Sequence, residues 1–250
     1  MKYLWKSFYS GQSSYLGSVY EGQVKCKTER SDWINTPLPV VVLASVRSQF
    51  HEMEEGSLKM QALLSLISEN VQGEKTFLIT DCAHLHVFSL IINGDIETAK
   101  KMEVLNGNKL ATRFQPFLEG WNCVFWHSYI STDSEYSSYQ KKIRDKYQSD
   151  PLFRSCIDRD IKKSYSEEKV VKFPNFSFFS QKTFEDLVEQ AVGLYILYKK
   201  GHRFLFYPGK SNALYDYVVN ELSFFYINFD VSIVKKKKMK TALQKSTDVR

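Results

Sequence analysis

Residues 38–45 read Leu-Pro-Val-Val-Val-Leu-Ala-Ser, an uncharged and mostly apolar run that ends on Ser45. A run of this length without strict alternation of apolar and polar residues is typical of a strand buried on both faces, as in a parallel sheet covered by helices. In open α/β sheets, ligands bind outside the carboxyl ends of the strands. The run therefore predicts a buried parallel strand and directs attention to Ser45, which follows it.

Similar apolar runs recur along the chain, with helical patterns between them. The further predicted strands are Thr76–Thr80, Cys123–Ile130, Arg203–Tyr207 and Phe224–Phe229. One predicted helix has its apolar face at Met60, Leu63, Leu64, Ile67 and Val71, and the others are Tyr136–Ile161 with a break near Pro151, Phe184–Lys199 and Ala213–Leu222. This alternation favours a doubly wound α/β fold.

We therefore expect a single Rossmann-like domain over residues 1–234, with a mostly parallel five-stranded sheet and helices on both faces. Residues 235–250 open with KKKKMK and are expected to form a basic, mobile tail. The expected assembly state is a monomer.

The positive charge of the chain is unevenly distributed. The formal net charge is +6, and the basic residues gather at Lys100–Lys101, Lys109–Arg113, Lys141–Lys146, Lys162–Lys163 and Lys235–Lys240. Such clustering suits an anionic macromolecule better than a small acidic metabolite. The alternative interpretation is a set of solvated helix faces, so charge alone does not establish nucleic acid binding.

Several classes of site are disfavoured. Cys26, Cys82, Cys123 and Cys156 form no CxxC pair and have no histidine at ligand spacing, so we expect neither a metal nor a disulfide framework. The start of the chain lacks the apolar core of a signal peptide, and no stretch reaches the ~18 apolar residues that a membrane helix needs. We expect a cytoplasmic protein with no membrane partner.

Nucleotide cofactors are not indicated either. No GxGxxG fingerprint is present, and Gly209-Lys210-Ser211 lacks the glycine that a phosphate-binding loop requires five residues earlier, where Phe204 stands. We expect no cofactor.

Residues that carry chemistry follow or flank the predicted strands. Ser45 is placed where a nucleophile would sit, although a serine that only tightens the turn is the alternative. Tyr207 ends the fourth run and would either pass protons or pack as core. Glu185 and Glu189 are four residues apart on one predicted helix, facing either solvent or an amine.

These residues resemble a known family. Over residues 36–230 the chain resembles the tRNA-dependent cyclodipeptide synthases, whose fold is like the catalytic domain of class I tyrosyl- and tryptophanyl-tRNA synthetases. That family has a Gly-x-Ser-x-x-Asn-Ser-Tyr-like loop after its first strand. Ser45 falls on the nucleophilic serine, Leu43 stands at the glycine, Ser48 at the asparagine and Phe50 at the aromatic position.

A tyrosine at the end of a late strand is the second mark of the family. It is followed by histidine in one branch and by proline in the other, and Tyr207-Pro208 has the tyrosine-proline form. The branch with proline is also the one in which the asparagine is replaced, so Ser48 and Pro208 agree with each other.

The resemblance implies an enzyme that joins the aminoacyl groups of two aminoacyl-tRNAs into a cyclic dipeptide, without ATP. It implies that Ser45 carries the acyl group, Glu189 holds the α-ammonium group and Tyr207 relays protons. Glu185 stands where the family has a tyrosine. The implied substrate-site residues are Leu43, Ser48, Asp81, Glu185 and Pro208. The implied tRNA-binding residues are Lys100, Lys101, Lys109 and Arg113.

Two other classes of function compete with this interpretation. A non-catalytic tRNA- or nucleotide-binding Rossmann protein would have the same basic surface but no acyl-enzyme. A serine hydrolase of α/β type needs a histidine after the last strands, and none follows Tyr207. The second class is therefore disfavoured.

Overall fold

We describe the fold from a computed structural model. The residues that it describes are 3–12, 19–28, 32–46, 54–165, 175–207, 212–228 and 230–235. The predictions made for Ser48, Pro208 and residues 236–250 lie outside these ranges.

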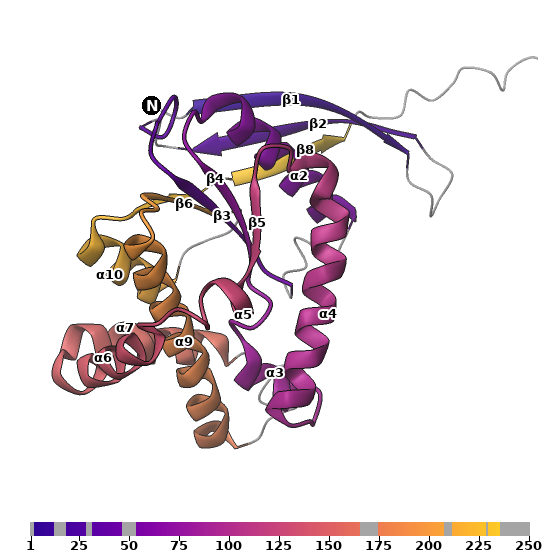
Figure 1. The fold of residues 1–250 in the computed structure, drawn as a ribbon. Helices are drawn as coiled ribbons and strands as arrows, with labels where there is room; N and C mark the ends of the chain where they lie inside the picture. Colours follow the sequence, from indigo (N-terminus) through magenta and orange to yellow (C-terminus); the bar gives the residue numbers. More distant parts are fainter. Residues whose placement is uncertain are drawn as a thin grey trace, which may run out of the picture.

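A five-stranded parallel sheet forms the centre of the fold (Figure 1). Its strands run in the order β5-β4-β3-β6-β7, and every neighbouring pair is parallel. The strands are β3 (Val40–Ala44), β4 (Lys75–Ile79), β5 (Asn122–Phe125), β6 (Phe204–Tyr207) and β7 (Phe225–Asn228). The predicted Rossmann-like class is confirmed.

Helices cover both faces of this sheet. Alternate residues of β3 point to opposite faces, and on each face they pack in an apolar cluster with residues of helices. Val40 and Val42 belong to one apolar cluster, whereas Val41 and Leu43 belong to the other. The first cluster includes residues of α2 (Glu54–Asn70), α4 (Ile96–Phe114) and the adjoining 3₁₀ helix η1 (Gln115–Phe117). The second includes residues of α3 (Leu85–Ile91), α6 (Tyr136–Ser149), α7 (Pro151–Ser164), α9 (Phe176–Lys199) and α10 (Ala213–Leu222).

Local capping explains the helix boundaries. The carboxylate of Asp150 accepts the backbone N–H groups of Leu152 and Phe153, and Pro151 opens α7, so the predicted break divides the segment into α6 and α7. Helix α9 begins at Phe176, well before the predicted Phe184, because the side chain of Asn175 caps it. None of the helices within the described residues is long and apolar enough to cross a membrane.

The apolar run Cys123–Ile130 was predicted as one strand, and this is wrong for its second half. Strand β5 ends at Phe125 and the chain turns into the short helix α5 (Trp126–Tyr129). The buried carboxylate of Asp81 accepts the backbone N–H of His127 at 3.2 Å and contacts its imidazole. That polar anchor bends the chain where the apolar pattern alone indicates a longer strand.

A second sheet was not predicted. It is antiparallel, in the order β1-β2-β8 (Figure 1). Its strands are β1 (Tyr3–Gln12), β2 (Val19–Thr28) and β8 (Asp230–Lys235). These segments mix apolar, polar and charged residues, so they lack the continuous apolar character that indicates a core strand.

A close contact between α5 and α9 fixes how α9 lies on the sheet. The indole of Trp126 is buried directly over Gly193, so that a Cβ atom added there would lie 2.0 Å from the ring. Glycine is therefore the residue that lets the helix and the ring approach each other.

We predict that Gly193→Ala destabilises the protein by about 1–3 kcal/mol or more, because the added methyl group cannot share space with the indole. In a chain of this size each kcal/mol lowers Tm by about 2–4 °C, which thermal unfolding followed by circular dichroism would detect. Gln181→Ala, at an exposed position of the same helix, is the control. Equal Tm values for the two variants would contradict the prediction.

Candidate active site

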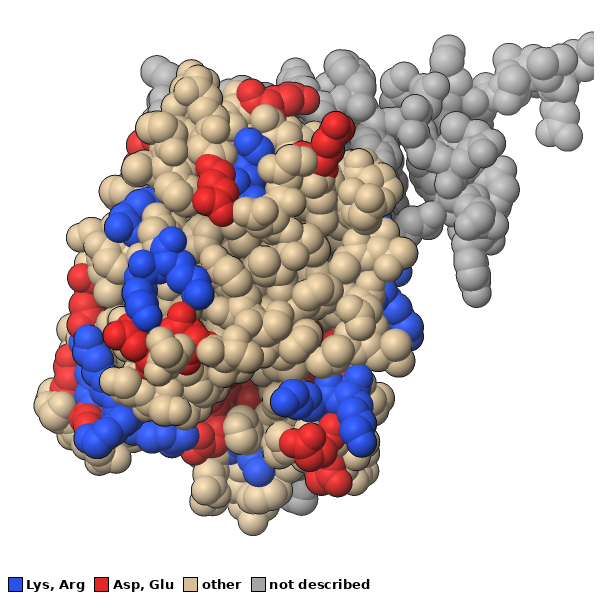
Figure 2. All heavy atoms as spheres, in the orientation of Figure 1, with Lys and Arg blue, Asp and Glu red and all other residues tan. Residues whose placement is uncertain are grey.

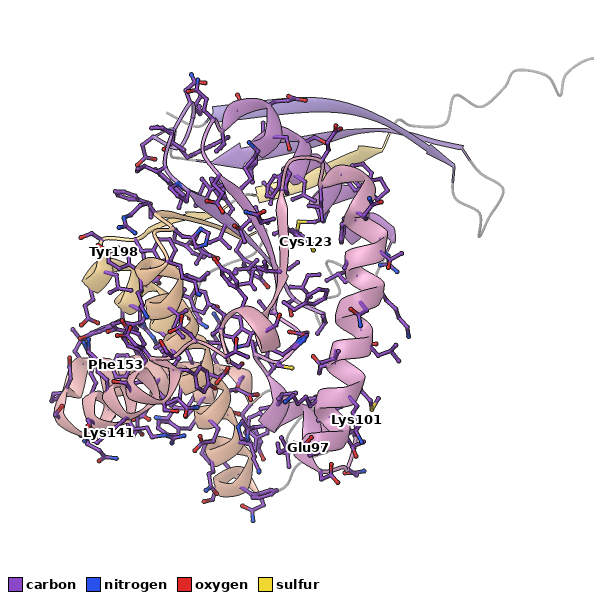
Figure 3. All side chains as sticks on the ribbon, in the orientation of Figure 1. Glu97, Lys101, Cys123, Lys141, Phe153 and Tyr198 are labelled. Carbon is purple, nitrogen blue, oxygen red and sulfur yellow. The ribbon has the colours of Figure 1, made fainter. Side chains whose placement is uncertain are left out.

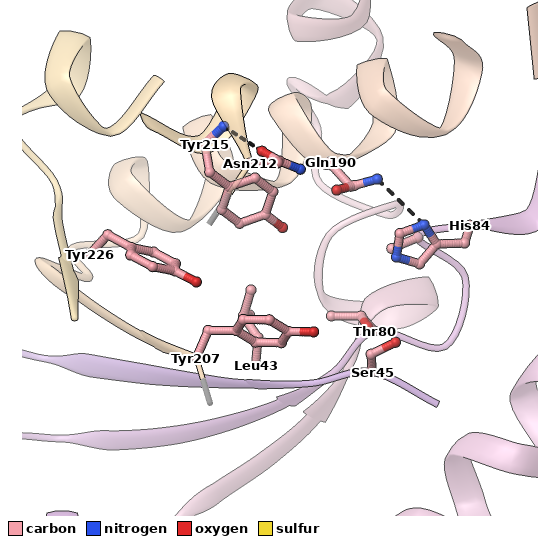
Figure 4. Close-up of a pocket in the computed structure, with 10 residues that line it drawn as sticks. Leu43, Ser45, Thr80, His84, Gln190, Tyr207, Asn212, Tyr215 and Tyr226 are labelled. Carbon is pink, nitrogen blue, oxygen red and sulfur yellow. Dashed lines mark hydrogen bonds between the residues drawn. The ribbon is translucent and has the colours of Figure 1, made fainter. Parts of the chain in front are cut away.

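A cavity of about 200 Å³ opens at the carboxyl ends of β3, β4 and β6 (Figure 4). Leu43 and Ser45 reach it from β3 and the residue that follows, and Tyr207 reaches it from the end of β6. These three predicted site residues are therefore brought together. The loop after β4 contributes Thr80 and His84 to the opposite wall.

Contacts with the neighbouring strand hold Ser45 at this edge. The carbonyl oxygen of Ala44 accepts the backbone N–H of Thr80 at 2.9 Å and lies 3.4 Å from its hydroxyl group. These contacts extend the pairing of β3 and β4 by one step, so Ser45 is the first residue beyond the sheet. It is buried, with 9% of its surface exposed, so a reacting group there would be shielded from bulk water.

Three tyrosines form the wall on the side of α10 and β7. Tyr207, Tyr215 and Tyr226 come from β6, α10 and β7, and their hydroxyl groups point into the cavity (Figure 4). Burial raises the pKa of Tyr215 and of Tyr226 above the ordinary value. Both groups therefore remain protonated at neutral pH and can donate hydrogen bonds to a bound molecule.

The α9 residue that lines the cavity is Gln190 rather than the expected Glu189. The side-chain amide nitrogen of Gln190 donates to Nδ1 of His84 at 3.4 Å (Figure 4). Residues that follow each other on a helix are about 100° apart around its axis, so Glu189 and Gln190 point to different neighbours.

Glu189 lies in a buried polar network between three helical segments. Its carboxylate accepts the indole N–H of Trp126 at 2.6 Å and the hydroxyl group of Tyr136, and Ser131 lies 3.5 Å away. Burial raises its pKa above the ordinary value, and the three hydrogen bonds only partly offset this. The contacts give Glu189 a structural position that joins α5, α6 and α9.

Glu185 and Asp81, two other expected substrate-site residues, are not among the residues that line the cavity. Each is bound by a partner elsewhere. The guanidinium group of Arg144 binds the carboxylate of Glu185 in a bidentate manner. Asp81 holds the start of α5 through His127. Asp81, Cys82 and His127 lie close enough to share an ion, but the direct contact of Asp81 with His127 accounts for their grouping. Burial and the nearby carboxylate raise the pKa of Cys82 to about 12.

The expected tRNA-binding residues lie on α4. Lys100, Lys101, Lys109 and Arg113 are all exposed there, and Figure 2 shows basic atoms along this side of the molecule. Figure 3 places Lys101 on α4, far from Lys141 on α6.

On α6, three of the four basic residues from Lys141 to Lys146 have acidic partners. Lys141 pairs with Asp145 at 2.5 Å and Lys146 pairs with Glu221 at 2.6 Å, while Arg144 pairs with Glu185.

Sequence reasoning missed His84, Gln190, Asn212, Tyr215 and Tyr226, which also line the cavity. His84 and Asn212 follow strands, so attention to every polar residue after a strand would have found them. No pattern in the sequence indicates the inward direction of Gln190, because it depends on how α9 is rotated.

Comparison with known proteins shows which solved structures have a similar fold. Neither a protein-family model nor a curated protein matches the chain. Among solved structures, a CDPS from Fluoribacter dumoffii matches with a TM-score of 0.72 and 16% identity, covering 84% of this chain and 99% of that one.

Two further structures have the same fold. A cyclodipeptide synthase from Candidatus Glomeribacter gigasporarum, bound to Phe-tRNAPhe, matches with a TM-score of 0.63 and 19% identity, covering 88% of this chain and 97% of that one. A Mycobacterium tuberculosis protein matches with a TM-score of 0.57 and 13% identity, covering 84% and 93%. Its structure is described as demonstrating that cyclodipeptide synthetases are related to type I tRNA synthetases. The chain therefore has the fold of cyclodipeptide synthases.

We predict that Glu189 makes stability fall as pH rises. Its pKa in the folded protein lies above the ordinary value of 4.5, so the folded state binds this proton more tightly than the unfolded chain does. That contribution is complete below the unfolded pKa and is lost as pH rises through the folded pKa. Glu189→Gln removes it at nearly constant volume.

Urea unfolding of both proteins from pH 4.5 to neutrality would test this. The free energy of unfolding of the unchanged protein, relative to that of Glu189→Gln, should decrease across this range, by about 1.4 kcal/mol for each unit by which the pKa is raised. A constant or increasing difference would refute the prediction.

Proposed function

We propose that the chain is a tRNA-dependent cyclodipeptide synthase of the tyrosine-proline branch, with Ser45 as its nucleophile. The observation that carries the proposal is the position of Ser45, at the cavity on the carboxyl edge of a sheet with the cyclodipeptide synthase fold. Acyl transfer needs a nucleophile that is shielded from water but open to a substrate, and Ser45 satisfies both conditions.

The proposed reaction begins with two acyl transfers and ends with a ring closure. The hydroxyl oxygen of Ser45 attacks the ester carbonyl of the first aminoacyl-tRNA, and the tRNA leaves with its ribose hydroxyl group protonated. The amine of the second aminoacyl-tRNA then attacks the Ser45 ester, giving a dipeptidyl-tRNA or, after return to Ser45, a dipeptidyl-enzyme. Attack of the terminal amine on the remaining ester closes the diketopiperazine ring. No ATP is needed because each aminoacyl ester is already activated.

Tyr207 is suited to the proton transfers of this scheme. It lines the same cavity as Ser45, and its hydroxyl group points inward from the end of β6 (Figure 4). Leu43 would contact the aminoacyl side chain from β3. The assignment to the tyrosine-proline branch rests on the sequence alone, through Ser48 and Pro208.

The proposed macromolecular partners are two aminoacyl-tRNAs. The structure of the similar protein bound to Phe-tRNAPhe supports this class of partner. The exposed basic residues on α4 lie on one side of the molecule and would contact the phosphates of an acceptor arm, whereas the paired residues of α6 would contribute less.

A non-catalytic tRNA-binding protein is the second candidate function. The neutral amide of Gln190, at the cavity position where a glutamate was expected, is the observation that favours it. This candidate has the same basic surface but requires no acyl-enzyme, so experiments on Ser45 separate the two.

We predict that Ser45→Ala abolishes formation of cyclic dipeptides, because no acyl-enzyme can form without the hydroxyl group. Mass spectrometry of culture supernatants from bacteria expressing each variant would measure the product, and the mass of the intact protein after incubation with aminoacyl-tRNA would reveal the acyl adduct. Ser128→Ala, at an exposed serine of α5, should retain both signals.

Each result has a distinct meaning. Product from both variants would show that another residue carries the acyl group. Absence of product from the folded, unchanged protein would support the binding-only function.

We predict that the triple variant Lys100→Ala, Lys101→Ala and Lys109→Ala raises KM for aminoacyl-tRNA with little change in kcat, because phosphate contacts contribute to binding and not to the acyl transfer itself. The salt dependence of binding should also become weaker, by about 0.7–0.9 in the log–log slope for each lost contact.

The matched control is Lys141→Ala, Lys162→Ala and Lys163→Ala, which removes the same charge from α6 and α7. Equal increases in KM for the two triple variants would show only a general charge effect and would contradict a specific role for α4.

A further inference from the structure

We propose that Asp81, Cys82 and His127 form a binding site for a zinc ion, which joins the segment after β4 to α5. The oxygen, sulfur and nitrogen donor atoms of these three side chains lie within 4.8 Å of one another. The described lining of the reactive cavity includes none of the three. The zinc site is therefore separate from the proposed acyl transfer and does not depend on it.

The spacing of the three donor atoms suits a single ion. Zinc lies about 2.0–2.3 Å from its nitrogen, oxygen and sulfur ligands, so two ligands of one ion are at most about 4.5 Å apart. Donor atoms that already lie within 4.8 Å of one another need only small side-chain rotations to meet this condition. Three protein ligands leave the fourth tetrahedral position to a water molecule.

The two oxygen atoms of Asp81 have different contacts. Oδ1 accepts the backbone N–H of His127 at 3.2 Å, and Oδ2 contacts Nδ1 of its imidazole. The first bond can persist while an ion replaces the hydrogen atom between Oδ2 and Nδ1. The contact of Asp81 with His127 thus assembles the cluster before an ion is bound, and Cys82 is brought along because it follows Asp81 in the chain. Such preorganisation reduces the cost of gathering the ligands.

The charges around the sulfur atom favour a cation. Asp81 and Glu103 are buried, with 0% and 1% of their surface exposed, and both act on the charge of Cys82, while Lys100 acts in the opposite sense. Buried carboxylates are costly unless a donor or a cation compensates them. The buried thiol keeps its proton when no ion is present, whereas a thiol that coordinates a divalent cation is deprotonated outright and releases that proton to solvent.

The donor set indicates which ion binds. A sulfur atom, an imidazole nitrogen and a carboxylate oxygen suit zinc, whereas magnesium and calcium prefer oxygen ligands alone. The side chain of His127 is 30% exposed, which gives an ion access from solvent. His127 follows Asp81 by 46 residues, so the spacing of ligands along the sequence does not indicate this site.

An ion at this position would stabilise one wall of the reactive cavity. Thr80 and His84 line that wall (Figure 4), and Asp81 and Cys82 lie between them in the chain. Coordination by His127 would join this segment to α5. The role that follows from the position is structural, so its signature is metal-dependent stability of the folded protein.

Metal binding to the full chain, purified without a histidine tag and treated with a chelator, tests the inference. Calorimetry should give about one zinc ion per chain, as expected for one such site. Cobalt(II), a spectroscopic substitute for zinc, should give the charge-transfer band of a thiolate ligand and the visible bands of a tetrahedral ion. At a free zinc concentration of about 100 times Kd, Tm should rise by about 5–10 °C.

Variants then identify the ligands. Cys82→Ser removes the sulfur atom but keeps the contact of Asp81 with His127. It should abolish the thiolate band and weaken zinc binding by more than the 10–100-fold (roughly) that loss of an outer-shell partner costs. His127→Gln should weaken zinc binding similarly. Cys123→Ser, which removes an exposed thiol outside the cluster, is the matched control and should change neither the band nor Kd.

Each outcome decides for or against the zinc site. Folded, unchanged protein that binds neither zinc nor cobalt would overturn the inference. A thiolate band that survives in Cys82→Ser, or that disappears in Cys123→Ser, would also overturn it, because the ion would then lie at another thiol. Tm values without metal identify variants that fail to fold. If Cys82→Ser does not fold, loss of zinc binding in folded His127→Gln supports the site, and unchanged binding there refutes it.

These results are independent of the proposed function. If the unchanged protein makes a cyclic dipeptide but binds no metal, the zinc site is wrong and the proposed function stands. If it binds zinc through Cys82 but forms no product, the zinc site stands and the proposed function fails.

Discussion

The rotation of α9 about its own axis is the constraint on which the site depends. The indole of Trp126 rests on Gly193, and its N–H group donates to Glu189 one turn earlier. Together these contacts allow the helix one orientation on the sheet. That orientation turns Glu189 into the protein and Gln190 toward the cavity. Buried polar groups must find partners, so satisfying the Glu189 carboxylate also determines which neighbouring side chain lines the cavity.

The parallel sheet provides the second half of the site, because its carboxyl edge gathers residues that are far apart in the chain. Ser45, His84 and Tyr207 follow or end three different strands, yet they face one cavity. Parallel backbone pairing of β3 with β4 and with β6 keeps these strand ends in register. The site therefore combines a rigid edge, set by backbone pairing, with one helix whose rotation is set by side-chain packing.

These two components differ in how well the sequence predicts them. The parallel strands, and with them Leu43, Ser45 and Tyr207, could be predicted because continuous apolar runs and strand ends are local patterns. The spacing of Glu185 and Glu189 indicated a shared acidic face on a helix, but their partners Arg144 and Trp126 are distant in the sequence and turn both acids away from the cavity. The bend after Phe125 was missed for a similar reason, since it depends on Asp81. The strands of the antiparallel sheet were missed because their mixed composition carries no core signal.

The antiparallel sheet also determines the order in which its strands can pair while the protein is being synthesised. Strand β2 pairs on one side with β1 and on the other with β8, so that Gly22 faces Lys235. The ribosome completes β1 and β2 first and reaches β8 only after the chain between β2 and β8 has been made. At typical elongation rates this takes on the order of ten to forty seconds. During that interval one edge of β2 has no strand beside it, and such an edge can pair with another nascent chain. Among the described strands, a strand that is translated late thus closes an edge that forms early.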